Sequence, residues 1–251
     1  MLRLSGRKVA LSLPRRLASD LVRCARSVPL MRVERRLSLG TVAEARADAL
    51  GRPGWCAVFI KAFALVATGR PELRRAYIPY PIPHLYEHPT SIASVAVLRP
   101  VGAEEAVFFV PLRSPELQTV RAIDVFLRRC QERPLEDVAI IRRILQLSRW
   151  PLPLRCLWWG RTQFLGTVRA RHLGTFSVGE GPNLGAVSPH LLTPTTSAIN
   201  YGVIAPDGSV DVSLSFDQRV LTPGLAVRVL EEMGDALNGP IAEAFGVATG
   251  P

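Results

Sequence analysis

The chain has few lysines, no long apolar run and no signal for secretion, and each absence narrows its class. Its only lysines are Lys8 and Lys61, so the net charge of +10 comes almost wholly from arginine. No run of about 18 apolar residues occurs, so we expect no membrane-spanning helix. The basic N-terminus lacks a continuous apolar segment and a cleavage site, so we expect no signal peptide.

The cysteines and histidines do not show metal-ligand spacing. The cysteines lie far apart without a C-x-x-C pair, mostly within apolar helical patterns, which predicts buried free thiols in a reducing cytoplasm. They are Cys24, Cys56, Cys130 and Cys156. His84 and His88 are four residues apart, but the prolines around them forbid a regular helix. We therefore predict no metal site, and a loop over residues 77–91 that packs on its own aromatic side chains.

The surplus of arginine invites a nucleic-acid or anionic-membrane interpretation. The sequence has no zinc-ligand spacing, no helix-turn-helix pattern and no basic stripe interleaved with aromatic residues. We therefore predict no nucleic-acid partner. An arginine-biased composition and solvated helix faces account for the charge.

Strand and helix patterns alternate along the whole chain, and no linker separates them. With 251 residues and a hydrophobic content of 48%, the chain can bury one large core. We therefore predict a single domain over residues 1–251.

The most informative stretch lies near the C-terminus, from Val210 to Gly224. Apolar and polar residues alternate up to position 217, which is the signature of a strand with one apolar face. The polar residues Asp217, Gln218 and Arg219 stand at its end, before a turn and a helical pattern. Such a turn holds polar side chains in fixed positions, so we expect the functional site here.

This stretch resembles the C-terminal signature of the catalytic domain in the acyltransferase component of 2-oxoacid dehydrogenase complexes, within the chloramphenicol acetyltransferase-like superfamily. The family pattern is D-H-R-x-x-D-G after a strand of the S-L-S-[YF] type. This chain has the strand SLSF followed by Asp217 and Arg219. Gln218 stands where the family has its catalytic histidine, and Thr222 stands where it has an aspartate.

Further matches follow in the same order along residues 15–237. The run around Lys61 fits the family pattern F-x-x-K-A-x-A-x-A, and residues 173–178 fit its G-T-F-T-I-S strand. The resemblance implies an α/β fold, a two-layer sandwich of the chloramphenicol acetyltransferase type with helices packed on a mixed sheet. It also implies a homotrimer, or a mixed trimer with a paralogue, whose active site lies between subunits.

In the resembled family, acyl groups move between coenzyme A thioesters and a second nucleophile. The histidine takes the proton of that nucleophile, which requires a base whose pKa lies near the working pH. Gln218 cannot act as this base, because an amide only donates and accepts hydrogen bonds. Coenzyme A or acyl-CoA is thus the implied substrate, with no covalently bound cofactor. Asp217 and Arg219 are expected to keep a structural ion pair.

Other residues are candidates for the roles that the motif leaves open. The family has its oxyanion-stabilising serine where this chain has Gly179, so the donor must be another hydroxyl. The candidates are Ser177, Thr195, Thr196 and Ser197, for each of which an ordinary structural role is the alternative. His190 could serve as a displaced base or lie solvated in a loop. His172, in the basic run RARH, is expected to be solvated.

Residues 138–168 depart from the family pattern and combine arginines with three tryptophans. Indoles and guanidinium groups beside aliphatic residues suit a bilayer interface. A helical hairpin that packs on the core and bends at Pro151 and Pro153, or a contact between subunits, explains the pattern as well. We expect a cytoplasmic protein, peripheral to the membrane only in the first case.

Two local predictions concern helices. Lys61 lies in the middle of an apolar run from Trp55 to Gly69, where a snorkelling or ion-paired lysine is expected. Ser114 is expected to cap a long amphipathic helix whose apolar stripe includes Leu117 and Ile123.

Two functional hypotheses follow from the sequence. The first is a stand-alone acyltransferase-family protein that binds or transfers acyl groups from coenzyme A thioesters without the usual general base. The second is a catalytically inactive member, a pseudoenzyme, that acts as an interaction or scaffold subunit. Binding of acyl-CoA distinguishes the two.

Overall fold

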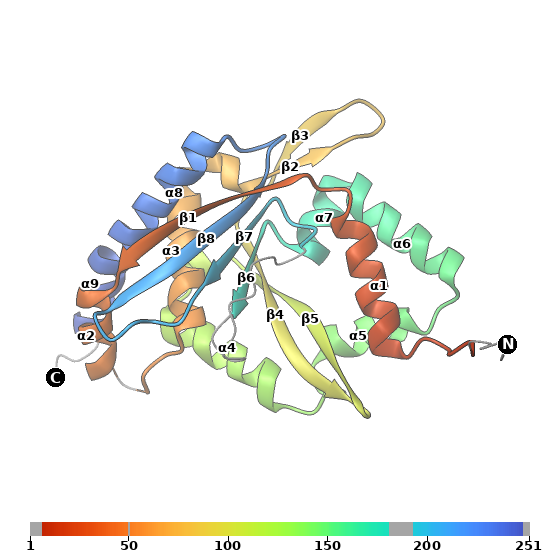
Figure 1. Cartoon of the computed structure of the whole chain (residues 1–251), viewed down its shortest axis with the longest axis horizontal. Coiled ribbons are helices and arrows are strands. Elements are labelled where there is room, and N and C mark those ends of the chain that lie inside the picture. The colour runs from red at the N-terminus through yellow and green to blue at the C-terminus, as the bar shows by residue number, and fades with distance from the viewer. Residues whose placement is uncertain (1–6, 50, 181–192, 248–251) are drawn as a thin grey trace, which may run out of the picture.

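A six-stranded mixed sheet forms the centre of the computed structural model, which describes residues 7–49, 51–180 and 193–247 (Figure 1). The strand order is β1-β8-β7-β6-β4-β5. β6 pairs in parallel with β4 and with β7, and the other neighbours are antiparallel. The strands are β1 (Leu30–Ser38), β4 (Ile92–Val101), β5 (Glu104–Arg113), β6 (Phe176–Glu180), β7 (Ser197–Tyr201) and β8 (Ser209–Asp217). The predicted α/β class with a mixed sheet is confirmed.

Helices α3 (Trp55–Gly69), α4 (Val120–Glu132) and α8 (Pro223–Ala236) pack on one face of this sheet. Because side chains alternate along a strand, Val95 and Val110 point into the core on this face. Ser94 and Phe109 point to the other face and line a cavity there. The sheet therefore has a second, separately covered surface at β4 and β5.

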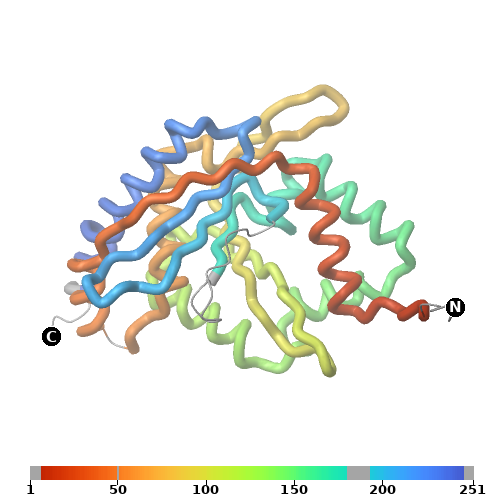
Figure 2. Tube along the Cα trace, viewed as in Figure 1, coloured from red at the N-terminus to blue at the C-terminus, as the bar shows by residue number. Residues whose placement is uncertain are grey.

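Four helices gather over this second surface, as Figures 1 and 2 show on the side of the molecule that carries the N-terminus. They are α1 (Leu13–Ala25), α5 (Ala139–Ser148), α6 (Leu152–Phe164) and α7 (Gly166–Leu173). α1, α5 and α7 contact β5, while α6 packs on α1 and α7. Residues 138–168 thus pack on the core, as one of the predicted alternatives has it, but α5 and α6 pack mainly on α1, β5 and α7 and not on each other as a hairpin. Among the described residues, no helix is long and apolar enough to cross a membrane.

The remaining elements are short. They are α2 (Gly40–Asp48), η1 (Pro71–Arg74), η2 (Pro115–Leu117), the π-helical turn η4 (Leu237–Ile241) and α9 (Ala242–Val247). Helices α2 and α9 contact each other beside β1 and α8 at the end of the sheet away from α6 (Figure 1).

Helix α3 is apolar on all sides because the sheet, α4 and α8 surround it. Phe59 stacks on Tyr201 of β7, with ring centroids 4.3 Å apart. Lys61, in the middle of this helix, donates hydrogen bonds from Nζ to the carbonyl oxygens of Glu116 and Gln118, at 2.6 and 2.7 Å. Burial lowers the pKa of its ammonium group. Lys61 therefore holds the chain before α4 through backbone carbonyls, and among the described residues it forms no ion pair.

The prediction of a loop over residues 77–91 is wrong, because two strands lie in this range. Strands β2 (Arg75–Ile78) and β3 (His84–Glu87) form a two-stranded antiparallel hairpin separate from the main sheet. Three prolines lie in the connection, residues 79–83, where they remove no ladder hydrogen bond. These prolines exclude a regular helix, as predicted, but they are compatible with a hairpin.

The predicted cap of α4 at Ser114 is also wrong. Ser114 has a left-handed backbone with φ of 46° and precedes η2. Thr119 is the N-cap, and its hydroxyl accepts a hydrogen bond from the N–H of Ala122. Leu117, assigned to the apolar stripe, has 82% of its surface exposed, whereas Ile123 is fully buried. Helix α4 has the predicted apolar stripe, but the stripe begins after Leu117, at Val120.

The prediction of buried free thiols is confirmed for three of the cysteines and wrong for the fourth. Cys24, Cys56 and Cys130 are buried, and Cys156 is exposed on α6. The sulfur of Cys156 accepts a hydrogen bond from Nη1 of Arg23 at 2.8 Å. Burial raises the pKa of the Cys24 thiol to about 11, which makes it a poor nucleophile.

Candidate functional site

Strand β8 carries the polar motif to one end of the sheet. It lies between β1 and β7, and its alternate side chains from Val210 onward are buried in the core. The N–H of Asp217 donates to the carbonyl of Thr196 at 2.8 Å, and the N–H of Gln218 donates to the carbonyl of Pro29 at 3.4 Å. The connections before both neighbouring strands therefore fix the backbone of the motif.

Asp217 and Arg219 form the expected ion pair. The Asp217 carboxylate is fully buried, and it accepts hydrogen bonds from Nε and Nη2 of Arg219, at 2.9 and 2.7 Å. It also accepts one from the backbone N–H of Arg219 at 3.0 Å. The guanidinium lies over the ring of Tyr77 in β2, 4.2 Å from its centroid. This two-pronged pair closes the turn on itself and attaches it to the β2–β3 hairpin.

Gln218 is exposed between these two residues, and its side chain makes no hydrogen bond within the described part of the chain. Its amide is free to donate to, or accept from, a ligand. Thr222 is the N-cap of α8, and its hydroxyl accepts a hydrogen bond from the N–H of Leu225 at 3.4 Å. Pro223 occupies the first helical turn, where its missing N–H leaves no orphan donor.

Arg169 of α7 is a charged group near the motif that sequence reasoning missed. It is 4% exposed, and its Nη2 donates to the carbonyl of Pro194 at 2.7 Å. Burial lowers the pKa of its guanidinium, the Asp217 carboxylate raises it, and Arg219 lowers it again. Asp217 therefore lies in the field of two arginines. Within the basic run of residues 169–172 nothing distinguishes this arginine from its neighbours, so only tertiary packing identifies it.

Two of the candidate hydroxyls meet in a buried cluster. The hydroxyls of Ser177, Thr193 and Thr195 lie 2.8 to 3.2 Å from one another. The Thr195 hydroxyl also donates to the carbonyl of Ser197 at 2.8 Å. Thr193 was not predicted, and it joins the cluster because residues 193–195 run back toward β6. These hydroxyls are already satisfied by one another, which favours a structural role.

The other two candidates behave differently. Thr196 contributes its backbone carbonyl to Asp217, and its side chain makes no hydrogen bond in the described ranges. The Ser197 hydroxyl is buried without a hydrogen-bond partner among the described residues. Ser197 pairs with Phe216 across the β7–β8 ladder, one residue before the motif. Because Ser197 is 0% exposed, this unsatisfied hydroxyl lies inside the core next to the motif strand and not on a surface that a ligand reaches.

His190, the candidate for a displaced base, lies outside the described residues. His172 is not solvated as predicted: it is half-buried at the end of α7, with its ring 5.2 Å from that of Trp158, edge to face. Burial lowers the pKa of this imidazole, and four nearby arginines lower it further. The pair His84 and His88 uses its Nδ1 atoms for hydrogen bonds with the backbone carbonyls of Ile82 and Thr90.

The fold is that of the catalytic cores of dihydrolipoamide acetyltransferases. A probable dihydrolipoamide acetyltransferase from Listeria monocytogenes superposes with a TM-score of 0.60 at 16% identity, over 92% of this chain and 94% of that one. The dihydrolipoamide acetyltransferase of Azotobacter vinelandii gives 0.60 at 16% identity, over 94% and 92%. A truncated catalytic core of the 2-oxoacid dehydrogenase multienzyme complex from Thermoplasma acidophilum gives 0.58 at 14%, over 94% and 99%.

The match covers nearly all of each chain, so it concerns the whole architecture and not one motif. No family model and no curated sequence matches this chain. At these identities the likeness establishes the fold, and the chemistry has to be argued from the residues present.

Proposed function

We propose that this protein binds acyl thioesters of coenzyme A at the end of β8 and transfers the acyl group without a protein base. The observation that carries the proposal is the exposed Gln218, held between two residues of an intact Asp217–Arg219 ion pair. The acyltransferase-type fold supports it. In the Azotobacter enzyme, a serine, a histidine and an asparagine have been investigated for their role in the catalytic mechanism.

Without a histidine, the attacking group must ionise before it reaches the site. A thiol is the suitable acceptor, because a thiol of pKa near 8.5 is a few per cent thiolate at pH 7 and is intrinsically nucleophilic. The thiolate sulfur forms the bond to the thioester carbonyl carbon, and coenzyme A leaves as its own thiolate and takes a proton from water. The exposed Gln218 amide is the donor that can stabilise the developing oxyanion.

The test compares the native protein with Gln218→His, first in a titration with coenzyme A and acetyl-CoA and then in a transfer assay with a small thiol. We expect both proteins to bind, and the variant to transfer about 100- to 10,000-fold faster. Gln218→Asn is the matched control, because it changes the same site without adding a base. Failure of the native protein to bind coenzyme A or acetyl-CoA at millimolar concentration would contradict the proposal.

The same residues favour a second candidate, an inactive subunit that supports an assembly. Gln218 removes the proton acceptor, and Thr222 supplies a helix cap in place of a carboxylate. Such a subunit would form a trimer with itself or with an active paralogue. Light scattering of the purified protein then gives a trimer, while neither the native chain nor Gln218→His binds acyl-CoA.

A further inference from the structure

A surface groove of about 660 Å³ lies between α5, α6 and α7, three of the helices that cover the second surface of the sheet. Its volume falls within the range of about 300 to 1,000 Å³ that small-molecule sites have. The C-terminal half of α5 and the turn after it supply most of the lining, with the residues Arg143, Gln146, Leu147, Arg149 and Trp150. Residues 143, 147 and 150 are four and three positions apart, so one face of the helix and of this turn is directed at the groove.

Two indoles from different elements border the groove. Trp158 of α6 packs edge to face on Trp159 and on His172 of α7, with ring centroids 4.8 and 5.2 Å apart. Trp150, after the end of α5, is 44% exposed and has no ring contact in the described part of the chain. The groove therefore offers aromatic surface from two elements, on which a planar ligand can pack.

The polar side chains of the groove lack partners. The guanidinium groups of Arg143 and Arg149 are exposed, and neither forms a hydrogen bond or an ion pair with a described residue. The same holds for the amide of Gln146. Burial and nearby arginines lower the pKa of His172, so this ring is neutral near pH 7 and adds no further positive charge. Two cations and an amide are thus available to one ligand.

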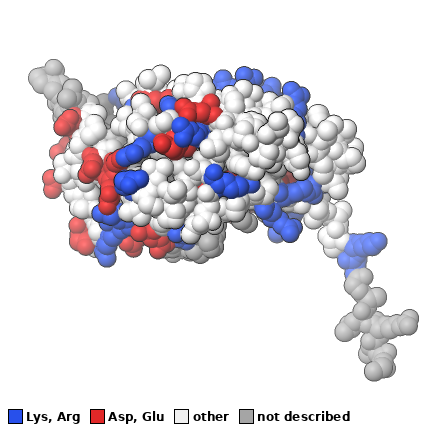
Figure 3. All heavy atoms as spheres, turned by 90° about the horizontal axis from the view of Figure 1, so that it is seen from above, with Lys and Arg blue, Asp and Glu red and all other residues white. Residues whose placement is uncertain are grey.

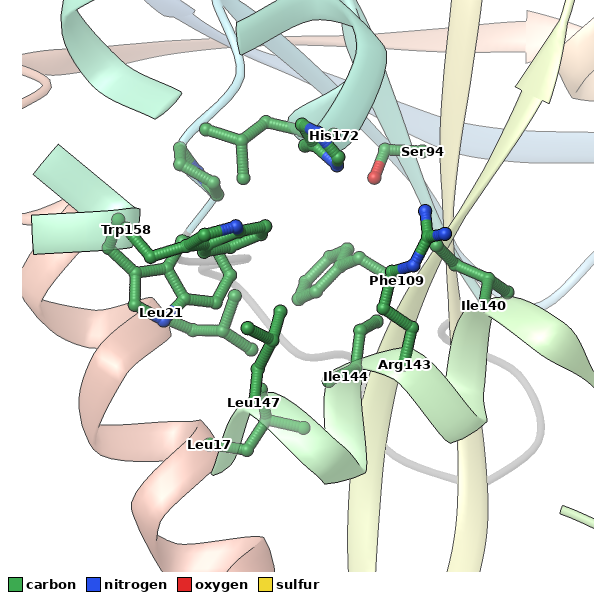
Figure 4. A pocket seen from close by; sticks show the side chains of 13 residues that line it. Leu17, Leu21, Ser94, Phe109, Ile140, Arg143, Ile144, Leu147, Trp158 and His172 are labelled. Atoms are coloured by element: carbon green, nitrogen blue, oxygen red, sulfur yellow. The ribbon is translucent and has the colours of Figure 1, made fainter. Parts of the chain in front are cut away.

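A separate, much smaller cavity shares four residues with the groove. Figure 4 shows the side chains around this cavity, among them those of Arg143, Leu147, Trp158 and His172. Its volume of about 30 Å³ holds one or two waters. A ligand of the groove therefore lies against the surface lining and does not enter the cavity.

The charges around the groove are one-sided. Residues 138–179 contain seven arginines and no aspartate or glutamate. Only Arg155 of these seven forms a salt bridge with a carboxylate among the described residues, that of Asp20 in α1. Figure 3 shows acidic side chains mainly toward the C-terminal helices and mainly basic ones toward the N-terminal side. Among the described residues that line the groove there is no carboxylate, so an anion meets cations without a competing charge.

We propose that this groove binds a nucleoside phosphate. The base packs on the indoles of Trp150 and Trp158, because every base has a flat face that stacks on an aromatic side chain. The phosphate lies on the guanidinium groups of Arg143 and Arg149, which match it in charge and geometry. Inorganic phosphate alone would leave the indoles unused, and an uncharged aromatic compound would leave both guanidinium groups unpaired.

The test is isothermal titration calorimetry of the full chain with AMP at constant ionic strength. Adenosine, which lacks the phosphate, and ribose 5-phosphate, which lacks the base, are the matched fragments. We expect saturable binding of AMP and at least about 5-fold weaker binding of each fragment. The reason is that base stacking contributes about 5- to 150-fold and a hydrogen-bonded charge about 10- to 100-fold. A fragment that binds as tightly as AMP, or no saturation with AMP, overturns the proposal.

Two arginines supply matched charge variants. Arg149→Gln removes a cation of the groove and should weaken the binding of AMP and of ribose 5-phosphate about 10-fold or more, without affecting adenosine. Arg142→Gln removes the same charge from an exposed residue of α5 that does not line the groove and donates to the carbonyl of Glu136, and binding should not change. Circular dichroism checks that both variants keep the native fold. An equal loss in the two variants means a general charge effect and contradicts the proposed site.

The aromatic contact has its own variants. Trp150→Leu keeps an apolar side chain but removes the ring, so AMP and adenosine should bind about 5-fold or more weakly while ribose 5-phosphate is unaffected. Trp150→Phe restores a flat ring and should recover part of the loss. If Trp150→Phe binds AMP as weakly as Trp150→Leu, or if Trp150→Leu binds it as tightly as the native protein, the base does not stack at this position.

The groove is separate from the motif at the end of β8, because no residue from Asp217 to Thr222 lines it. Binding of AMP therefore does not depend on whether the protein transfers acyl groups. Coenzyme A is itself a nucleotide, so its titration is repeated with Arg149→Gln, and the affinity for the acyl thioester should equal that of the native protein. A parallel loss of AMP and acetyl-CoA binding in Arg149→Gln would make the groove a part of the acyl-CoA site and contradict a separate one.

Discussion

The carboxylate of Asp20 and the guanidinium of Arg155 form a two-pronged ion pair that joins α1 to α6, with contacts of 2.9 and 3.0 Å. Their side chains are only 1% and 7% exposed. The pair therefore ties the atypical segment, residues 138–168, to the N-terminal helix in a setting where neither charge reaches water. A buried charge without its partner is strongly destabilising.

The first prediction removes one charge of this pair. Asp20→Asn keeps the shape of the side chain and leaves the Arg155 guanidinium uncompensated, so the free energy of unfolding should fall by about 3 to 5 kcal/mol. Urea denaturation measures it. The control is Glu231→Gln, which breaks the half-exposed pair with Arg35 and should cost about 0 to 1 kcal/mol. Similar losses in the two variants would show that burial does not strengthen the Asp20–Arg155 pair.

The second prediction concerns Lys61. In Lys61→Met the carbonyls of Glu116 and Gln118 lose their donor while the apolar stem is kept, so unfolding should become easier by about 1 to 3 kcal/mol. Lys8→Met, at the other and exposed lysine, should change stability by less than about 0.5 kcal/mol. Thermal or urea unfolding of both variants checks the difference. An unchanged free energy of unfolding in Lys61→Met would mean that water donates to the two carbonyls in place of the lysine.

The third prediction uses two glycines with similar backbones and different surroundings. Gly174 has a φ of 85°, and a methyl group there would lie 2.9 Å from the carbonyl oxygen of Ile92 and from Cβ of Ser94. Gly208 has a φ of 74°, and its nearest neighbours would be 3.8 Å away. Gly208→Ala should cost about 1 kcal/mol of backbone strain, and Gly174→Ala clearly more because the clash adds to it. Equal losses would show that β4 shifts to accommodate the methyl group.

The sequence predicted the elements whose own residues decide their structure. The alternation before Asp217 predicted β8, and the resemblance to the family motif implied the ion pair of Asp217 and Arg219. Ser114 and Leu117 show the limit of such local signals. Both Ser114 and Thr119 can cap a helix, and only the carbonyls held by Lys61, from a helix distant in sequence, show why no α-helix begins before Thr119.

The site was predicted in part for the same reason. Motif spacing identified Asp217, Gln218 and Arg219, because they are consecutive. Arg169 and Thr193 come from other elements, and their approach depends on how α7 and the segment before β7 pack. His172 was expected to be solvated because its sequence neighbours are basic, but α6 covers it. Local sequence carries no information about a helix that packs from outside.

The fourth prediction follows from that burial. The pKa of His172 is lowered in the folded chain and lies near 6.5 in the unfolded chain, so unfolding takes up a proton as the pH falls through this range. Stability should therefore decrease from about pH 7 toward the lower, folded-state pKa and level off below it. Urea midpoints across this range should fall less steeply in His172→Gln than in the native protein. His84→Gln, at an exposed ring, is the control and should keep the native slope.

The last prediction concerns Thr222, which stands where the resembled family has an aspartate. Thr222 caps α8 through a long hydrogen bond of 3.4 Å, so Thr222→Ala should cost only the lower part of the range of about 0.5 to 2 kcal/mol for lost caps. Thr222→Asp keeps an N-cap and adds a negative charge at the helix N-terminus, and it should equal or exceed the stability of the native protein. Urea unfolding at pH 7 compares the three proteins.

That comparison separates two roles of this position. If Thr222→Asp is as stable as the native protein, the turn accepts the carboxylate that the resembled family has at this position, and threonine there changes the charge without altering the fold. Gln218→His can then be combined with Thr222→Asp, and any further gain in acyl transfer belongs to the carboxylate. A marked loss of stability in Thr222→Asp would instead mean that the turn has adapted to threonine, which favours the inactive subunit over the acyltransferase.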